Sequence, residues 1–289
     1  MQIFSVEHLV RRSYDLALGG LVPLAPVWLP WLGILAGLHG VLFLLGGGNG
    51  GDNGLRAGRD ALSAVIMMIS ILFSLGMGVA WYRTLLQQRW PGGPLSIVID
   101  PALPTYALRL LAVVIAAIFG LIGIGLLTLL AAATLGTVLH NIIEALGMSR
   151  LADYPGRALI VLSMLAAFLG GLYVFSRCAP WLAAGAIGKN EVELGEVWRG
   201  TVAQAKPITW GLVLIYVPLM VFELGFSALT LWLEGELGGS LMGSDWAPLG
   251  FLLSVLSLLV SLFTTLVSVT YIALIFDTFF GKKHRLKAV

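Results

Sequence analysis

The charged residues of this 289-residue chain are confined almost entirely to the segments between six long apolar stretches. These stretches hold only one of the 32 charged side chains, Glu223, although they make up about half of the chain. They cover residues 21–45, 61–82, 110–133, 158–176, 210–233 and 249–276. A helix rises about 1.5 Å per residue, so each stretch is long enough to cross about 30 Å of hydrocarbon. The sequence therefore predicts an all-α polytopic membrane bundle of six transmembrane helices, with 1–289 as a single domain.

Composition excludes several other classes of protein. Apolar side chains make up 58% of the chain, more than a water-soluble enzyme of this size accommodates, because much of its surface must stay hydrated. The continuous apolar runs also lack the alternating polarity of a transmembrane barrel. A net charge of +2 carries no nucleic-acid signature. The partner that the composition predicts is the lipid bilayer, and nothing in it calls for a cofactor.

The distribution of Lys and Arg predicts how the chain is oriented. If the N-terminus is cytoplasmic, the inner segments carry thirteen of these cations and the outer segments carry four. Cytoplasmic loops of membrane proteins are enriched in Lys and Arg. We therefore expect a multi-pass protein of the cell (inner) membrane with both termini in the cytoplasm.

Two amphipathic helices are expected to lie on the inner membrane surface. The first covers residues 5–19, where Ser5 is a helix-capping residue and the apolar side chains fall on one face. The second covers residues 190–206, where Asn190 is followed three residues later by Glu193, ahead of apolar residues at helical spacing.

Glu223 is the one charged residue well inside a predicted span. An acid at the bilayer centre costs about 2.5–3.5 kcal/mol, so its side chain should face the bundle, a partner or water. His39 lies at a similar predicted depth and is a candidate partner. The pair is either a proton- or cation-coupled site or a structural hydrogen bond between helices.

The last predicted span carries small hydroxyl residues at alternating steps of three and four. They are Ser254, Ser257, Ser261, Thr264 and Ser268. Small side chains allow a second helix to approach closely, which favours a packing seam; the alternative is the polar lining of a solute path.

Catalytic and metal-binding patterns are weak. His140 and Glu144 are one helical turn apart, but no second His or Cys lies nearby in the sequence, so we expect no metal site. The sequence also lacks the spacing typical of an intramembrane protease, and no catalytic residue is proposed.

The segment after the fourth span resembles a known family. It contains Arg177, Pro180, the small-residue run 183–188 and the segment 196–201, which includes Trp198. This pattern, within about residues 160–206, resembles the membrane domain of bacterial glycerophosphodiester phosphodiesterases and its uncharacterised six-helix relatives. The resemblance implies a six-helix inner-membrane fold without an assigned activity. It carries over only Arg177, Pro180 and Trp198, as a structural joint at the membrane interface.

Two functions follow as hypotheses. The first is a non-enzymatic scaffold, envelope-homeostasis factor or subunit of a membrane complex, with other membrane proteins or a second copy as partners. The alternative is a small proton- or cation-coupled transporter, or a lipid-handling protein, that uses Glu223, His39 and the hydroxyl seam.

The charge asymmetry gives a direct test of topology. An epitope tag placed at either terminus should be inaccessible to antibody in intact spheroplasts and become accessible after permeabilisation. Labelling of either tag from outside would overturn the predicted orientation.

Overall fold

The chain folds into helices connected by short segments. The computed structural model describes residues 5–46, 53–147, 154–236 and 247–284, and this part of the chain contains no strand. Six of its helices are long and apolar enough to cross a membrane. They are α2 (Ala25–Gly46), α3 (Asn53–Gln87), α4 (Leu103–Ala145), α5 (Tyr154–Cys178), α8 (Ala205–Glu236) and α9 (Ala247–His284). The shorter elements are α1 (Val6–Leu21), η1 (Pro94–Ile97), α6 (Pro180–Ala186), α7 (Leu194–Gly200) and η3 (Val202–Gln204). The all-helical prediction is confirmed.

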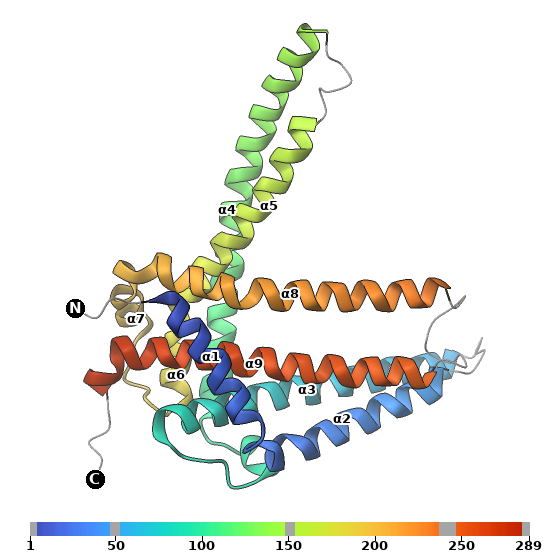
Figure 1. Ribbon diagram of the computed structural model, residues 1–289, viewed down its shortest axis with the longest axis vertical. Coiled ribbons are helices and arrows are strands. Elements are labelled where there is room, and N and C mark those ends of the chain that lie inside the picture. Colours follow the sequence, from blue (N-terminus) through green and yellow to red (C-terminus); the bar gives the residue numbers. More distant parts are fainter. Residues whose placement is uncertain (1–4, 47–52, 148–153, 237–246, 285–289) are drawn as a thin grey trace.

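The long helices form two groups. Helices α2, α3, α8 and α9 run side by side, whereas α4 and α5 form a hairpin that extends away from them (Figure 1). The chain enters and leaves the fold at one end of the four-helix group, close to where the base of the hairpin joins it (Figure 1). The spans therefore diverge from a common base.

Small residues hold the two helices of the hairpin together. A Cβ on Gly120 would lie 2.7 Å from Val174 Cγ2, and one on Gly171 would lie 3.2 Å from the backbone oxygen of Ala117. The Ser163 hydroxyl donates to the backbone oxygen of Thr128 at 3.1 Å. Because lipid chains are as apolar as leucine, such close approach is a main source of packing energy between helices in a membrane.

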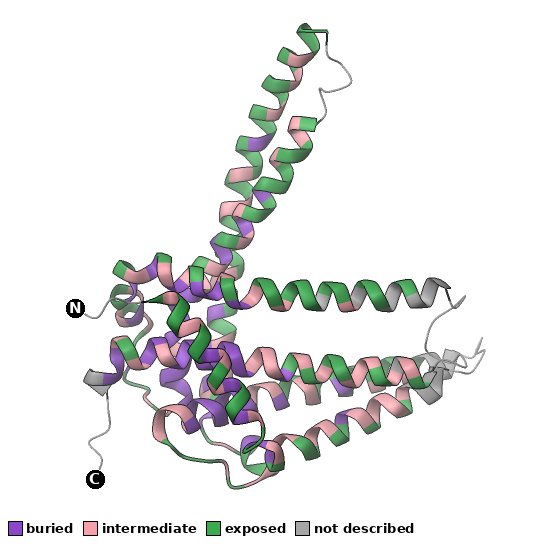
Figure 2. Cartoon of the chain, viewed as in Figure 1, coloured by how far each residue is buried: buried purple, intermediate pink, exposed green. Residues whose placement is uncertain are grey.

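Buried side chains concentrate at the base rather than along the spans (Figure 2). The largest of them include Tyr82, Leu182, Ile208, Leu266 and Tyr271. Gly211 lets the Tyr271 ring lie directly against α8, and the Tyr271 hydroxyl donates to the backbone oxygen of Ile208 at 3.0 Å. These side chains belong to one contiguous cluster of buried residues. The base is thus the most densely packed part of the fold.

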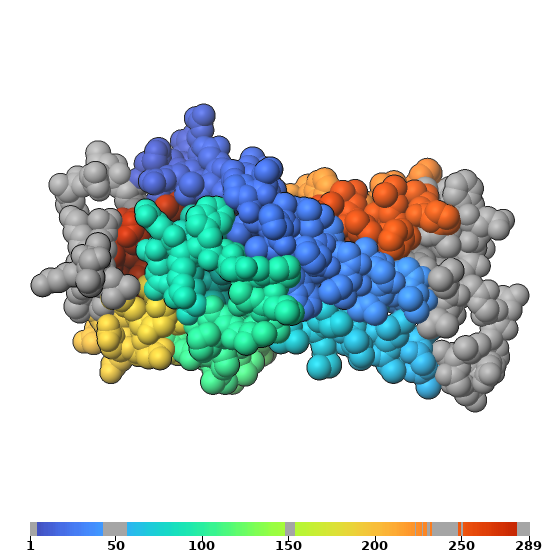
Figure 3. All heavy atoms as spheres, turned by 90° about the horizontal axis from the view of Figure 1, so that it is seen from below, coloured from blue at the N-terminus to red at the C-terminus, as the bar shows by residue number. Residues whose placement is uncertain are grey.

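The segment between α3 and α4 lies beside α1 and α2 on the surface of the base (Figure 3). The Trp31 indole donates to the backbone oxygen of Pro94 at 2.8 Å, which fixes η1 against α2. On its other side, η1 contacts α3 at Gly76, where an added Cβ would overlap the backbone oxygen of Ile97. The proline-rich segment between α3 and α4 thus packs in an ordered way against two spans, α2 and α3.

The two predicted surface helices have different outcomes. The expected helix at 5–19 is α1, and Ser5 Oγ accepts from the His8 backbone nitrogen at 3.4 Å. The prediction of a single helix over 190–206 was wrong, because α7 covers only Leu194–Gly200 and a separate turn, η3, leads into α8. The Thr201 hydroxyl donates to the backbone oxygen of Val197 at 3.0 Å, and the guanidinium of Arg177 donates to the backbone oxygen of Trp198. Both bonds lie in the last turn of α7, just before η3.

The contact between α3 and η1 predicts a stability difference between two glycines of the same helix. Gly76→Ala should lower the stability of the detergent-solubilised protein by about 1–3 kcal/mol, because the added methyl group meets fixed backbone. Gly58→Ala is the matched control, since nothing lies within 4 Å of its added Cβ; it should be neutral or stabilising by up to about 1 kcal/mol. Thermal unfolding of both variants measures the difference, and equal melting temperatures would contradict the packing.

Candidate functional site

The base is organised around α6, a short buried helix whose carbonyl end is held by cationic and amide side chains. Arg109 of α4 is 6% exposed, and its Nη1 donates to the backbone oxygen of Trp181 at 3.0 Å. Its guanidinium carbon lies 4.7 Å from the centre of the Trp181 ring. Gly185 leaves the space that the Arg109 side chain occupies, since an added Cβ would lie 2.8 Å from Arg109 Cδ. Its Nη2 also lies 3.5 Å from the backbone oxygens of Lys189 and Asn190, so Arg109 extends along α6 from a carbonyl of its first turn to carbonyls beyond its end.

A second cation reaches α6 from α3. Arg83 Nε donates to the backbone oxygen of Ala186 at 3.0 Å, and its Nη1 forms an ion pair with Asp100. Asp100 Oδ1 also accepts from the backbone nitrogen of Ala102 at 2.8 Å, just before α4 begins. The Gln87 amide donates to the Ile187 backbone oxygen at 3.0 Å. These bonds connect α3, α4 and α6.

The third cation is Arg177, at the end of α5. Its guanidinium carbon lies 3.6 Å from the centre of the Trp198 ring and 5.8 Å from that of Tyr173. Pro180 begins α6 two residues after α5 ends. The structure therefore brings Arg177 and Trp198 into contact and places Pro180 at the adjoining helix start. Their proposed role at the membrane interface stays a prediction.

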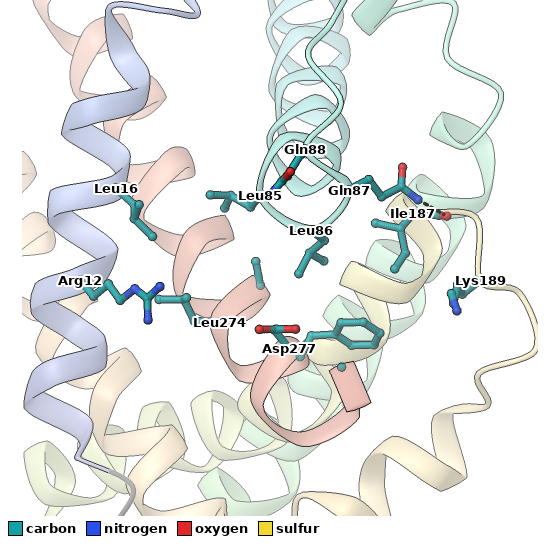
Figure 4. A pocket seen from close by; sticks show the side chains of 13 residues that line it. Arg12, Leu16, Leu85, Leu86, Gln87, Gln88, Ile187, Lys189, Leu274 and Asp277 are labelled. Atoms are coloured by element: carbon teal, nitrogen blue, oxygen red, sulfur yellow. Dashed lines mark hydrogen bonds between the residues drawn. The ribbon is translucent and has the colours of Figure 1, made fainter. Parts of the chain in front are cut away.

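A pocket of about 620 Å³ opens at the base, where several elements end. Its walls come from α1, the end of α3, the turn after α6 and the end of α9 (Figure 4). Its charged lining residues are Arg12, Lys189 and Asp277, and Gln87 and Gln88 add two amides. Asp277 lies between Arg12 on one side and Lys189 on the other in this view (Figure 4). The pocket combines both signs of charge with an apolar wall.

The predicted polar pair lies on two helices of the four-helix group. His39 is on α2, partly buried, with its Nδ1 2.8 Å from the backbone oxygen of Leu35. Glu223 is on α8, and its side chain lies outside the described residues. Helix α9 packs against both α2 and α8. Whether the two groups act together stays a prediction.

The five hydroxyl residues of α9 lie in different surroundings. Ser268 is buried, Ser254 and Thr264 are partly buried, and Ser257 and Ser261 are exposed. Ser261 lines a small cavity of about 40 Å³ together with Ser70 and Ser74 of α3. Ser261 thus borders α3, whereas Ser268 lies inside the packed base.

The possible metal pair His140 and Glu144 lies near the tip of the hairpin. His140 Nε2 is 3.8 Å from Glu144 Oε2, and both side chains are well exposed. Among the described residues, no three His, Cys, Asp or Glu side chains are grouped so as to hold a metal ion. The pair is a surface contact within one helical turn.

Sequence reasoning missed both α6 and the pocket. The run 179–186 contains mostly small residues, and it becomes a buried helix only because α3, α4 and α9 surround it. Asp277 comes one residue after the predicted end of the last span, so its distance from the other charges in the sequence concealed the pocket. A signal was present in Arg109, which adjoins the start of the third apolar stretch.

Comparisons with known proteins give no match for this chain: no family model, curated protein or solved structure resembles it significantly.

Arg177 and Arg199 form a matched pair for testing the cationic contacts of the base. Arg177→Gln should lower stability by about 1.5–3 kcal/mol, because it removes charge-assisted hydrogen bonds and ring stacking from a buried site. Arg199 is exposed, and its Nε donates to the backbone oxygen of Gly195 in the same helix at 3.2 Å. Arg199→Gln should change stability by less than about 0.5 kcal/mol. Thermal unfolding in detergent compares the two, and a smaller effect at Arg177 than at Arg199 would refute the assignment.

Proposed function

We propose that this chain is a non-enzymatic integral membrane protein that works as a scaffold or as a subunit of a membrane complex, including a role in envelope homeostasis. Its partners on this proposal are other membrane helices, from a different protein or from a second copy. The protein resides in the inner membrane with both termini in the cytoplasm. The Lys and Arg asymmetry supports this orientation, and the start of α1 and the end of α9 both lie at the base (Figure 1).

The observation that carries the proposal is the exposure of the α4–α5 hairpin. Beyond Val113, the only buried residue of α4 is Ala132. Large apolar side chains cover its outer surface, with Phe119 71% exposed and Leu127 70% exposed. The small residues of the hairpin already face each other, so the outward surface is left for lipid or for another protein.

The same geometry favours lateral contact over an enclosed solute path. Secondary transporters hold their substrates near the bilayer midplane, between helices that surround the site. Here the spans pack closely at the base and α4–α5 diverges from the other four (Figures 1 and 2). The transport alternative, with Glu223 and His39 on the path, requires those helices to close around a site at mid-depth. The resemblance of residues 160–206 to six-helix membrane relatives is compatible with either role.

Photo-crosslinking in living cells tests the proposal. A photoreactive amino acid at Phe119 or Leu127 should give discrete protein adducts, because these side chains point away from the rest of the chain. Met67 on α3 is the matched control, since it is 61% exposed but lies on the four-helix group. Adducts at the hairpin sites and not at Met67 are expected, and mass spectrometry tells a second copy from a different protein.

Two results would contradict this function. One is a hairpin that gives only lipid adducts at both sites. The other is solute or proton flux in proteoliposomes that Glu223→Gln abolishes while the protein stays folded, which would establish the transport alternative.

A further inference from the structure

The pocket at the base has no part in the proposed scaffold function, and its chemistry points to a ligand. We infer that it binds the headgroup of a phospholipid that carries both a phosphate and a primary amine, the phosphoethanolamine class. This inference goes beyond the proposed function and does not depend on it.

The location of the pocket matches the depth of lipid headgroups. Gln87, the last residue of α3, lines it, and so does Gly281, the last residue of the apolar part of α9. Arg12 and Leu16 of the amphipathic helix α1 form another wall. An amphipathic helix of this kind lies at the boundary between headgroups and acyl chains. A lipid reaches such a site from the bilayer without leaving its leaflet.

The lining is divided between apolar and polar groups, as an amphiphile requires. The apolar wall includes Leu16, Leu85, Leu86, Leu274 and Phe276. The volume of about 620 Å³ lies within the range of about 300–1,000 Å³ that is usual for small-molecule sites. A headgroup and the glycerol ester region attached to it suit this combination better than a free inorganic ion, which needs no apolar wall.

The charges specify which headgroup fits. Arg12 and Lys189 are suited to bind a phosphate, with the arginine able to donate two parallel hydrogen bonds. The carboxylate of Asp277 lies between them in Figure 4 and disfavours a headgroup that is only anionic. A primary ammonium donates hydrogen bonds to a carboxylate, whereas a quaternary choline cannot. The arrangement therefore fits a zwitterionic headgroup with a phosphate and a primary amine.

Native mass spectrometry of the delipidated full-length protein tests this inference. Phosphatidylethanolamine, phosphatidylglycerol and phosphatidylcholine with identical dioleoyl chains are the probes. We expect one molecule of phosphatidylethanolamine to bind tightly to each protein, and the other two lipids to bind more weakly. Asp277→Asn should reduce the preference for phosphatidylethanolamine over phosphatidylglycerol about tenfold, and Arg12→Gln should weaken the binding of both about tenfold, the effect of one charge-assisted hydrogen bond.

Arg11 provides the matched control, because it is an exposed neighbour of Arg12 that does not line the pocket. Arg11→Gln should leave binding unchanged, and Leu274→Trp should abolish it by filling the pocket. Thermal unfolding of each variant verifies that it is folded. If Asp277→Asn is unstable, Asp277→Glu, which keeps the charge, replaces it. Asp277→Glu should retain the preference for phosphatidylethanolamine, whereas Leu274→Trp should lose it.

Two results would overturn the inference. One is an equal loss of lipid binding in Arg11→Gln and Arg12→Gln, which would indicate general attraction to anionic lipid. The other is a preference for phosphatidylethanolamine that Asp277→Asn leaves unchanged. Water-soluble glycerophosphoethanolamine distinguishes a lipid ligand from a free headgroup. It should compete poorly because it lacks acyl chains, and competition as strong as that of the lipid would overturn the assignment to a lipid.

Discussion

Guanidinium groups bound to backbone carbonyls, two of them buried and one partly buried, hold this protein together at one end. Arg83, Arg109 and Arg177 come from three different long helices, and each donates to an oxygen in or near the short segment that follows α5. A buried cation left without partners costs several kcal/mol, so the three side chains and the segment they bind stabilise one another. The base ends of α3, α4 and α5 are therefore fixed relative to one another, because their arginines bind backbone oxygens of α6 and α7.

This constraint explains why the spans diverge. The apolar surfaces of long helices gain little from association in lipid, because acyl chains are as apolar as the leucine side chains of a neighbouring helix. Close contact persists where small residues permit it, as in the α4–α5 hairpin, and where polar groups require it, as at the base. Elsewhere the outer faces carry large apolar side chains that lipid or a partner helix can cover. A firm base with laterally open spans is the physical basis of the proposed scaffold role.

The sequence predicted the number and approximate positions of the six long helices, because burying a charge in hydrocarbon is so costly that charges mark the ends. It predicted those ends less well. The stretch 110–133 became α4 at Leu103–Ala145, since helix formation continues beyond the apolar core wherever no breaker intervenes. The entry helix agreed with its capping signal, whereas the segment expected as one helix over 190–206 is divided into α7, η3 and the start of α8, with a hydrogen bond from Arg177 of α5 at the end of α7 that local spacing does not reveal.

Contacts between distant segments were beyond the reach of the sequence. Arg177 and Trp198 were singled out together through a motif, and they lie in contact. Arg12 and Asp277 are far apart in the chain, and they line the same pocket because α1 packs against α9.

The divergence of the hairpin from the other four spans can be measured directly by pulsed electron paramagnetic resonance in nanodiscs. With spin labels at Thr137 on α4 and Leu229 on α8, and with Cys178 buried, we expect a separation well beyond that of packed helices. A distribution centred at packing distance, with helix axes about 8–10 Å apart, would contradict the account.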